Sequence, residues 1–414
     1  MGTTTGTTIT NTGIITSFGN TPQAVDDYFL AADTGLTEET VTKIVTLDVM
    51  ANDLGGKAKT LFAIDDGTSD GGIRPTDLLT QDLGRAESCS TDYSASHAHI
   101  WITADGKIGY DTSTWSDNFK TQLQHLGAGQ YATDTFTYSI RMANGTLSWA
   151  TATVQIAGVN DVPVLSAITG GGATEALDAS AQDIAAIHGT LSVSDLDVGD
   201  TLTASVTGSP SLVWSGGALT APQVTALMAE LVTGKLSFDG TATSNGGAAS
   251  IGYSYDPAAA NLDFLRAGQT LTITYQVKVN DGTVDSGVQD VTFTITGTND
   301  APVLSDTTNP DAVAELGNAS AQDLAAINGS FSVTDLDVGD SLHASVVGSP
   351  TVLLNGVAFS LPAGAGALTA PGAFTLTDTT SNGGAASIGY SYDPAAANLD
   401  FLRAGQTLTI TYQV

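Results

Sequence analysis

The chain has 414 residues, and 43 acidic against 12 basic residues give a formal net charge of −31 at pH 7. This balance excludes nucleic acid and anionic membranes as favoured partners and makes cations the natural counter-charge. The single cysteine, Cys89, excludes an intramolecular disulfide framework, and no segment has the roughly 18 consecutive apolar residues of a membrane helix.

The first 24 residues form a Thr-rich tail without the features of a Sec signal peptide. No basic residue precedes Lys43, and the segment has no apolar core. We therefore expect either a cytosolic protein or one exported through a C-terminal signal beyond Val414.

Residues 25–160 form the first of three predicted modules, module one. Its clearest strand, DTFTYSIRM at 134–142, alternates between apolar and polar residues. The residues on the apolar face of this strand are Phe136, Tyr138, Ile140 and Met142. Upstream, Phe119, Leu123 and Leu126 are spaced as one face of a short helix.

Module one contains two segments that could form a metal site. Cys89 precedes His97 and His99, which share one strand face, so a transition-metal site or a Cys–His dyad is one interpretation. A buried thiol with two edge histidines explains the same pattern and is favoured. The segment AIDDGTSDGG holds three closely spaced carboxylates, those of Asp65, Asp66 and Asp70. A calcium loop and a mobile Gly-rich loop both fit it, and the second is favoured.

Residues 161–299 form module two, which ends in an antiparallel hairpin. The strand LTITYQVKV at 271–279 and the strand VTFTITG at 291–297 alternate strictly, and turn-forming residues separate them. The predicted inward residues of the hairpin are Leu271, Ile273, Tyr275, Val277, Val279, Val291, Phe293 and Ile295. The stretch 221–234 has helical spacing instead, and we expect it to be a peripheral helix.

Residues 300–414 form module three, a second copy of the same design. Thr243 to Val277 recurs without a change as Thr380 to Val414, so the chain is an array of one repeated module. Short alternating strands joined by Gly-, Thr-, Asp- and Asn-rich turns predict an all-β fold of tandem Greek-key β-sandwiches in an extended array.

Module three has no counterpart of the strand Val291–Gly297, so we expect module three to lack its last strand. Either the chain continues, or a neighbouring copy supplies a strand. The tail 1–24 is the candidate donor, because it carries Ile9, Ile14, Ile15 and Phe18.

Two motifs mark the module boundaries. GVND at 158–161 recurs as GTND at 297–300, and VSDLDVGD at 193–200 recurs as VTDLDVGD at 333–340. With AGQTLTITYQVKVNDG, these motifs resemble the VCBS repeats of large bacterial secreted adhesins, which are cadherin-like and immunoglobulin-like modules in long arrays. The resemblance implies export to the cell surface or medium, often by type I secretion.

The resemblance to cadherin-like modules also implies calcium ligands at the junctions between modules. Cadherins hold calcium with an Asn-Asp linker, an Asp-x-Asp pair of the following domain and an acid of the preceding domain. The counterparts at the first junction are Asn160, Asp161, Asp195, Asp197 and either Glu38 or Glu39. Those at the second junction are Asn299, Asp300, Asp335, Asp337 and Glu175. Asp263 and Asp281 lie where cadherin-type modules place further ligands.

Calcium takes six to eight oxygen ligands, which such acidic junctions supply. The alternative is that Asp-x-Asp-x-Gly-Asp is a solvated turn, but its duplication beside a boundary favours the metal. We expect Asp197 and Asp337 to lie on turns that face the surface. The linker is shorter than in cadherins, which favours fewer ions at each junction.

The catalytic motifs of serine hydrolases, zinc proteases and phosphate-binding loops are missing from the sequence, and near-identical modules argue against a unique active site. Trp101 and Trp149 lie in alternating apolar segments and are expected in the core, not on a carbohydrate-binding surface.

The sequence therefore predicts a non-enzymatic, extracellular, calcium-stiffened array of a bacterial surface adhesin or fibre, with a role in adhesion, biofilm or a stalk. Two alternatives remain, a filament or surface-layer subunit completed by strand donation and a scaffold region of a larger secreted enzyme or toxin. Expected partners are calcium, neighbouring modules or copies, and surface carbohydrate or protein.

Overall fold

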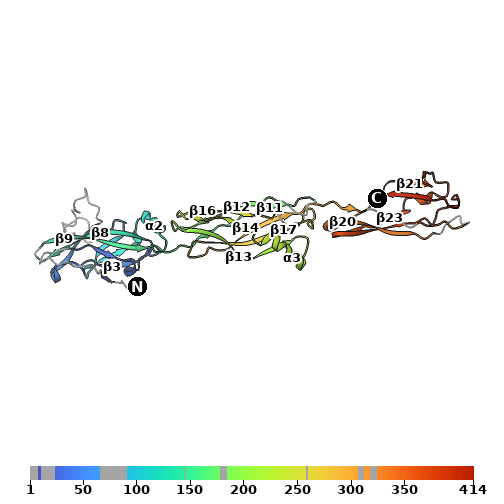
Figure 1. Ribbon diagram of the computed structural model, residues 1–414. Helices are drawn as coiled ribbons and strands as arrows, with labels where there is room; N and C mark the ends of the chain where they lie inside the picture. The colour runs from blue at the N-terminus through green and yellow to red at the C-terminus, as the bar shows by residue number, and fades with distance from the viewer. Residues whose placement is uncertain are drawn as a thin grey trace, which may run out of the picture.

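The computed structural model is an all-β chain whose three modules follow one another in a row (Figure 1). The structure describes residues 8–10, 24–65, 91–143, 145–177, 184–257, 260–305, 312–317 and 324–414. Each module is a sandwich of two sheets, and neighbouring strands in a sheet are often distant in sequence, as in Greek-key sandwiches. The tandem β-sandwich fold predicted from the sequence is confirmed.

Module one pairs a sheet of order β1-β3-β7-β6-β5 with a sheet of order β2-β9-β8-β4. Its strands are β1 (Thr8–Thr10), β2 (Asp27–Phe29), β3 (Ile44–Asp48), β4 (Lys59–Asp65), β5 (Thr91–Tyr93), β6 (His99–Ile102), β7 (Ile108–Asp111), β8 (Tyr131–Met142) and β9 (Leu147–Ala157). Its α-helices are α1 (Ala31–Thr34) and α2 (Asp117–Leu123), and 3₁₀ turns cover Gly56–Ala58 and Thr112–Thr114.

Module two pairs sheets of order β10-β12-β16-β14 and β11-β18-β17-β13-β15. Its strands are β10 (Val164–Leu165), β11 (Gly171–Thr174), β12 (Ile187–Ser194), β13 (Thr201–Trp214), β14 (Leu236–Asp239), β15 (Ala242–Thr243), β16 (Ala248–Tyr255), β17 (Thr270–Asn280) and β18 (Gln289–Thr296). Helix α3 (Ala221–Leu227) continues as a π-helical turn over Met228–Val232.

Module three pairs sheets of order β19-β20-β24-β23 and β22-β21-β25. Its strands are β19 (Val303–Leu304), β20 (Ile327–Leu342), β21 (Val347–Leu354), β22 (Val357–Ala358), β23 (Phe374–Leu376), β24 (Thr379–Tyr392) and β25 (Leu408–Gln413). A 3₁₀ turn over Gly366–Thr369 stands where module two has α3.

The alternation in the sequence predicts most of the core of modules one and two correctly, but Met142, expected on the apolar face of its strand, is only half-buried. All eight inward residues of the module-two hairpin are at most 2% exposed, and Phe136, Tyr138 and Ile140 of module one are fully buried. In α2 the side chain of Ser116 accepts a hydrogen bond from the N–H of Phe119 and caps the helix. Phe119 and Leu123 are buried, as the helical spacing predicts.

The tail contributes one described strand. The backbone of β1 runs parallel to β3 of the same chain, with Thr8 opposite Thr46. The apolar tail residues Ile14, Ile15 and Phe18, proposed for strand donation, lie outside the described residues.

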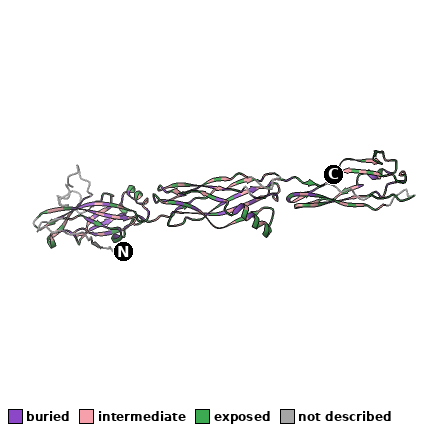
Figure 2. Cartoon of the chain, viewed as in Figure 1, coloured by how far each residue is buried: buried purple, intermediate pink, exposed green. Residues whose placement is uncertain are grey.

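Module three buries much less of its interior than module two (Figure 2). Strand β17 lies between β13 and β18, whereas β25, with the same residues, pairs only with β21 in the part of the chain that the structure describes. Ile273 is therefore fully buried, and its counterpart Ile410 is only half-buried. The core of module three is divided into two smaller clusters.

Candidate metal centres at the module junctions

The first junction brings together carboxylates from module one, the linker and module two. One oxygen each of Glu38, Asp161 and Asp197 lie within 4.8 Å of one another. Glu38 is placed there because its N–H pairs with the carbonyl of Ala157 at the end of β9. Asp197 lies in the turn between β12 and β13, where its N–H donates to Oδ1 of Asp195 at 3.0 Å.

Each of these three carboxylates has one buried oxygen that accepts no hydrogen bond from the described residues. The N–H of Val159 donates to Oε1 of Glu38 at 2.7 Å, and the N–H of Asp161 donates to Oδ2 of Asp197 at 2.8 Å. The other oxygens, Glu38 Oε2, Asp161 Oδ2 and Asp197 Oδ1, are buried and accept no hydrogen bond from the described residues. Buried carboxylate oxygens without donors are costly unless a cation neutralises them.

A second group of acids adjoins the first. Oxygens of Asp195, Asp197 and Asp200 also lie within 4.8 Å of one another. Asn160 connects this group to the linker, because its Nδ2 donates to the carbonyl of Asp161 at 2.7 Å and to Oδ2 of Asp281 at 2.9 Å. Asp281 therefore belongs to the first junction, as a residue of module two.

The second junction repeats the linker hydrogen bonds of the first, but its acids form a different inter-module group. The N–H of Asp300 donates to Oδ2 of Asp337 at 2.8 Å, and Nδ2 of Asn299 donates to the carbonyl of Asp300 at 2.6 Å. The two groups of acids whose oxygens lie within 4.8 Å are Glu175, Asp263 and Asp300, and Asp335, Asp337 and Asp340. Asp263 therefore belongs to the second junction.

The expectation that the Asp-x-Asp turns face the surface is wrong. Asp197 and Asp337 are both 0% exposed. The loop of the preceding module covers them, because the N–H of Val198 donates to the carbonyl of His125 at 3.1 Å and the N–H of Val338 to that of Phe264 at 3.3 Å.

Of the two acids considered in module one, the structure places Glu38 in the junction, at 1% exposure, while Glu39 is exposed. Sequence reasoning missed Asp200 and Asp340, although each is the last residue of the duplicated Asp-x-Asp-x-Gly-Asp motif. It also missed Arg266, which lies beside Asp340.

Burial makes these carboxylates hard to ionise without a counter-charge. It raises the pKa of Glu38 from 4.5 to about 7, against the lowering effect of the Val159 amide. Burial and then the charge of Asp300 raise the pKa of Glu175 to about 8. Burial likewise raises the pKa of Asp197 and of Asp337 to about 6. A divalent cation would reverse these shifts by favouring the ionised forms.

The other candidate sites gain no such support. Cys89, Asp66 and Asp70 lie outside the described residues, and Asp65 is the buried last residue of β4. His97 and His99 lie against the ring of Tyr93, with ring centroids at 4.3 and 5.7 Å.

The two tryptophans expected in the core of module one are not buried there. Trp149 is 43% exposed, so its assignment to the core is wrong, and Trp101 is half-buried with its indole over Gly109. Trp149 lies on the solvent face of β9 because its neighbours Ser148 and Ala150 alternate with it and Ala150 takes the buried position.

No protein-family model matches the chain, and no curated protein matches it. Its structure is similar to that of protocadherin gamma B2 extracellular cadherin domains 1–5, with 11% identity, a TM-score of 0.34 and coverage of 95% of this chain and 59% of that one. It is also similar to mouse cadherin-23 EC22–24, with 15% identity, a TM-score of 0.35 and coverage of 95% and 94%. The chain thus spans less than two thirds of the protocadherin gamma B2 fragment.

Proposed function

We propose that the chain is a non-enzymatic repeat array in which calcium ions, bound between consecutive modules, hold those modules in line. We place the module boundaries at residues 25–160, 161–299 and 300–414, with the ligands on either side of each boundary. The candidate ligands are Glu38, Asn160, Asp161, Asp195, Asp197, Asp200 and Asp281 at the first junction, and Glu175, Asp263, Asn299, Asp300, Asp335, Asp337 and Asp340 at the second.

The observation that carries this proposal is the close approach of carboxylate oxygens of Glu38, Asp161 and Asp197. These oxygens come from two modules and from the linker, and they lie within 4.8 Å of one another. Calcium–oxygen distances are about 2.3–2.6 Å, so oxygens this close together fit around one ion. Because the set is complete only when the two modules are apposed, an ion bound there stabilises the aligned arrangement by mass action.

The type of calcium site proposed supports an extracellular location. Binding sites of this type in extracellular modules have dissociation constants of roughly 10⁻⁴ to 10⁻³ M, which suits calcium outside the cell. Among the residues described, no helix is long and apolar enough to cross a membrane. Together with the resemblance to VCBS repeats, this type of calcium site supports a bacterial surface adhesin or fibre.

Small-angle scattering of the full chain tests the proposal. In millimolar calcium we expect a longer and less variable particle than in chelator, together with a higher melting temperature. The double variant Asp197→Asn and Asp337→Asn should lose both effects while its modules remain folded. Asp290→Asn, a change at an exposed acid of module two, is the matched control. Identical scattering and melting with and without calcium would reject the proposal.

A second candidate function has one observation in its favour. Strand β25 has an open edge among the described residues, and its apolar side chains are only half-buried. Such an edge pairs readily with another strand, which supports a filament in which copies complete one another. Fibres that lengthen with protein concentration, seen by negative-stain microscopy, would favour this function, and particles of fixed length would reject it.

A further inference from the structure

The loops through which each module touches the next are similar at the two junctions, although the acid Asp263 of module two has Gln124 as its counterpart in module one. The segment LGAGQ at 126–130 in module one matches LRAGQ at 265–269 in module two. The carbonyl of Gln130 accepts from the N–H of Gly158 at 2.9 Å, and that of Gln269 accepts from the N–H of Gly297 at 2.8 Å. Gly127 and Arg266 are therefore at equivalent positions in modules one and two.

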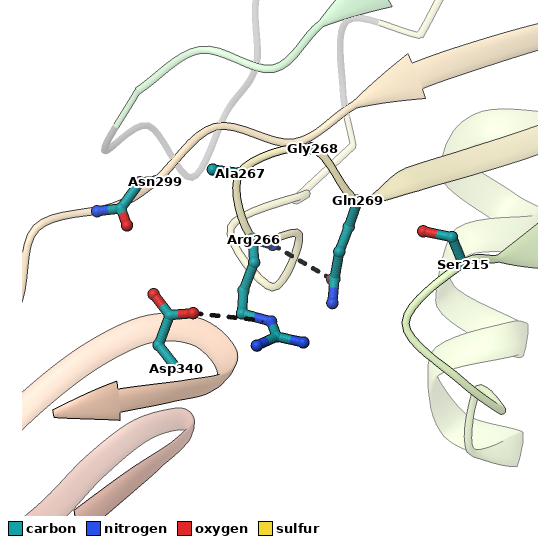
Figure 3. A pocket seen from close by; sticks show the side chains of 7 residues that line it. All are labelled: Ser215, Arg266, Ala267, Gly268, Gln269, Asn299 and Asp340. Carbon is teal, nitrogen blue, oxygen red and sulfur yellow. Dashed lines mark hydrogen bonds and ion pairs between the residues drawn. The ribbon is translucent and has the colours of Figure 1, made fainter.

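At the second junction this loop position carries the positively charged guanidinium of Arg266. Nη1 of Arg266 donates to the carbonyl of Gly339 at 3.0 Å. Nε of Arg266 lies 3.7 Å from Oδ1 of Asp340 (Figure 3). Asp340 belongs to the acid group that also contains Asp335 and Asp337. A fixed positive charge thus lies at the edge of this group, on the side of the preceding module.

At the first junction the same place is left open. A Cβ added to Gly127 would lie 3.5 Å from Cγ of Asp197, which is ordinary contact, so this position has room for a Cβ atom beside Asp197. Asp195 and Asp197 are at most 2% exposed, and each has a buried oxygen without a described donor. Within the described ranges, no lysine or arginine forms an ion pair with this acid group.

At the opposite end of module one, a lysine side chain lies beside a buried carboxylate. There the N–H of Val25 donates to Oδ1 of Asp53 at 2.7 Å, as the linker amides do at the junctions. Nζ of Lys59 donates to the carbonyls of Met50 and Asp53. A lysine therefore supplies positive charge at this end, where Asp53 is buried.

We propose that Arg266 is a built-in counter-ion that takes the place of one calcium ion at the second junction, so that the first junction binds one ion more than the second. This inference rests on the proposed function. A guanidinium beside Asp340 repels a divalent cation in the same acid group and is always charged. The second junction therefore keeps part of its alignment in the absence of calcium, and the first junction does not.

Counting the calcium bound by the full chain, by equilibrium dialysis with metal analysis, tests this inference. Arg266→Gly and Arg266→Gln should each bind one ion more than the wild type, and Arg266→Lys should bind the wild-type number because it keeps the charge. Gly127→Arg should bind one ion fewer. Arg403→Gly is the matched control, because Arg403 lies in the identical segment of module three, where the described residues show no ion pair for it.

The outcomes separate the two proposals. If the wild type binds calcium but neither Arg266→Gly nor Arg266→Gln changes the number of ions, the counter-ion role is wrong and the proposed function stands. An extra ion in Arg266→Lys would also overturn it, because the charge would then not be the cause. If the wild type binds no calcium, both proposals fail. Circular dichroism of each variant shows that the modules remain folded.

Discussion

The N–H of Asp161 donates to Oδ2 of Asp197 at 2.8 Å, and this bond connects the linker to the turn between β12 and β13 of module two. Asp300 and Asp337 form the same bond at the same distance at the second junction. The carboxylate that fixes the path of the linker is thus also a candidate calcium ligand through its other oxygen. Any ion bound there would act directly on the angle between modules.

Glu38 and Glu39 provide a matched pair of variants. Glu38→Gln removes a buried charge from the first junction, so calcium affinity at that junction should fall about tenfold or more, which equals about 1.4 kcal/mol. Glu39→Gln changes an exposed neighbour and should lower affinity much less. Isothermal titration calorimetry measures both. Equal losses in the two variants would contradict the assignment of Glu38 as a ligand.

The stability of the metal-free chain should fall as the pH rises. Burial raises the pKa of Glu38 to about 7 and that of Glu175 to about 8, from 4.5, so the folded chain holds more protons than the unfolded chain between these values. The melting temperature of dialysed, metal-free protein should therefore be higher near pH 5 than near pH 8. Excess calcium should reduce or reverse this trend, because it binds the ionised carboxylates.

A double variant checks the cause of this pH dependence. Glu38→Gln together with Glu175→Gln cannot titrate at these two positions, so its calcium-free melting temperature should vary less with pH. An unchanged slope would assign the pH dependence to other groups.

Identical strands in modules two and three should differ in their contribution to stability. Ile273→Ala removes a fully buried side chain and should cost about 2–5 kcal/mol, whereas Ile410→Ala, at a half-buried site, should cost about 1 kcal/mol. Differential scanning calorimetry measures the transition of each module. Equal costs would mean that module three is packed as tightly as module two.

A peptide with the sequence of Gln289–Gly297 should bind to module three. In module two this segment pairs with β17, with Ile273 opposite Phe293, and β25 presents the same residues with an edge that no described strand pairs with. Binding should raise the melting temperature of module three and leave that of module two unchanged. A peptide with Asp in place of Phe293 is the control and should not bind, because it would bury a charge against Ile410.

Much of the fold and part of the candidate site follow from local sequence. The hairpin of module two was predicted residue by residue, because period-two alternation decides which face is buried. The motifs of Asp161 and Asp197 repeat beside each boundary, and the structure brings oxygens of these two residues within 4.8 Å of each other. Trp149 was misplaced, because alternation defines two faces but does not say which of them a core covers.

The sequence by itself determined the repeat, many of the strands and the acidic motifs beside both boundaries, because each depends on neighbouring residues along the chain. The tertiary structure decided which acids meet, that Asp197 and Asp337 are buried, and that Arg266 faces Asp340 while Gly127 leaves the equivalent place open. It also decided that Ile273 is buried and Ile410 is not, although the residues around them in the sequence are the same. Burial and pairing depend on which segments pack against a residue, and those segments are distant in the chain.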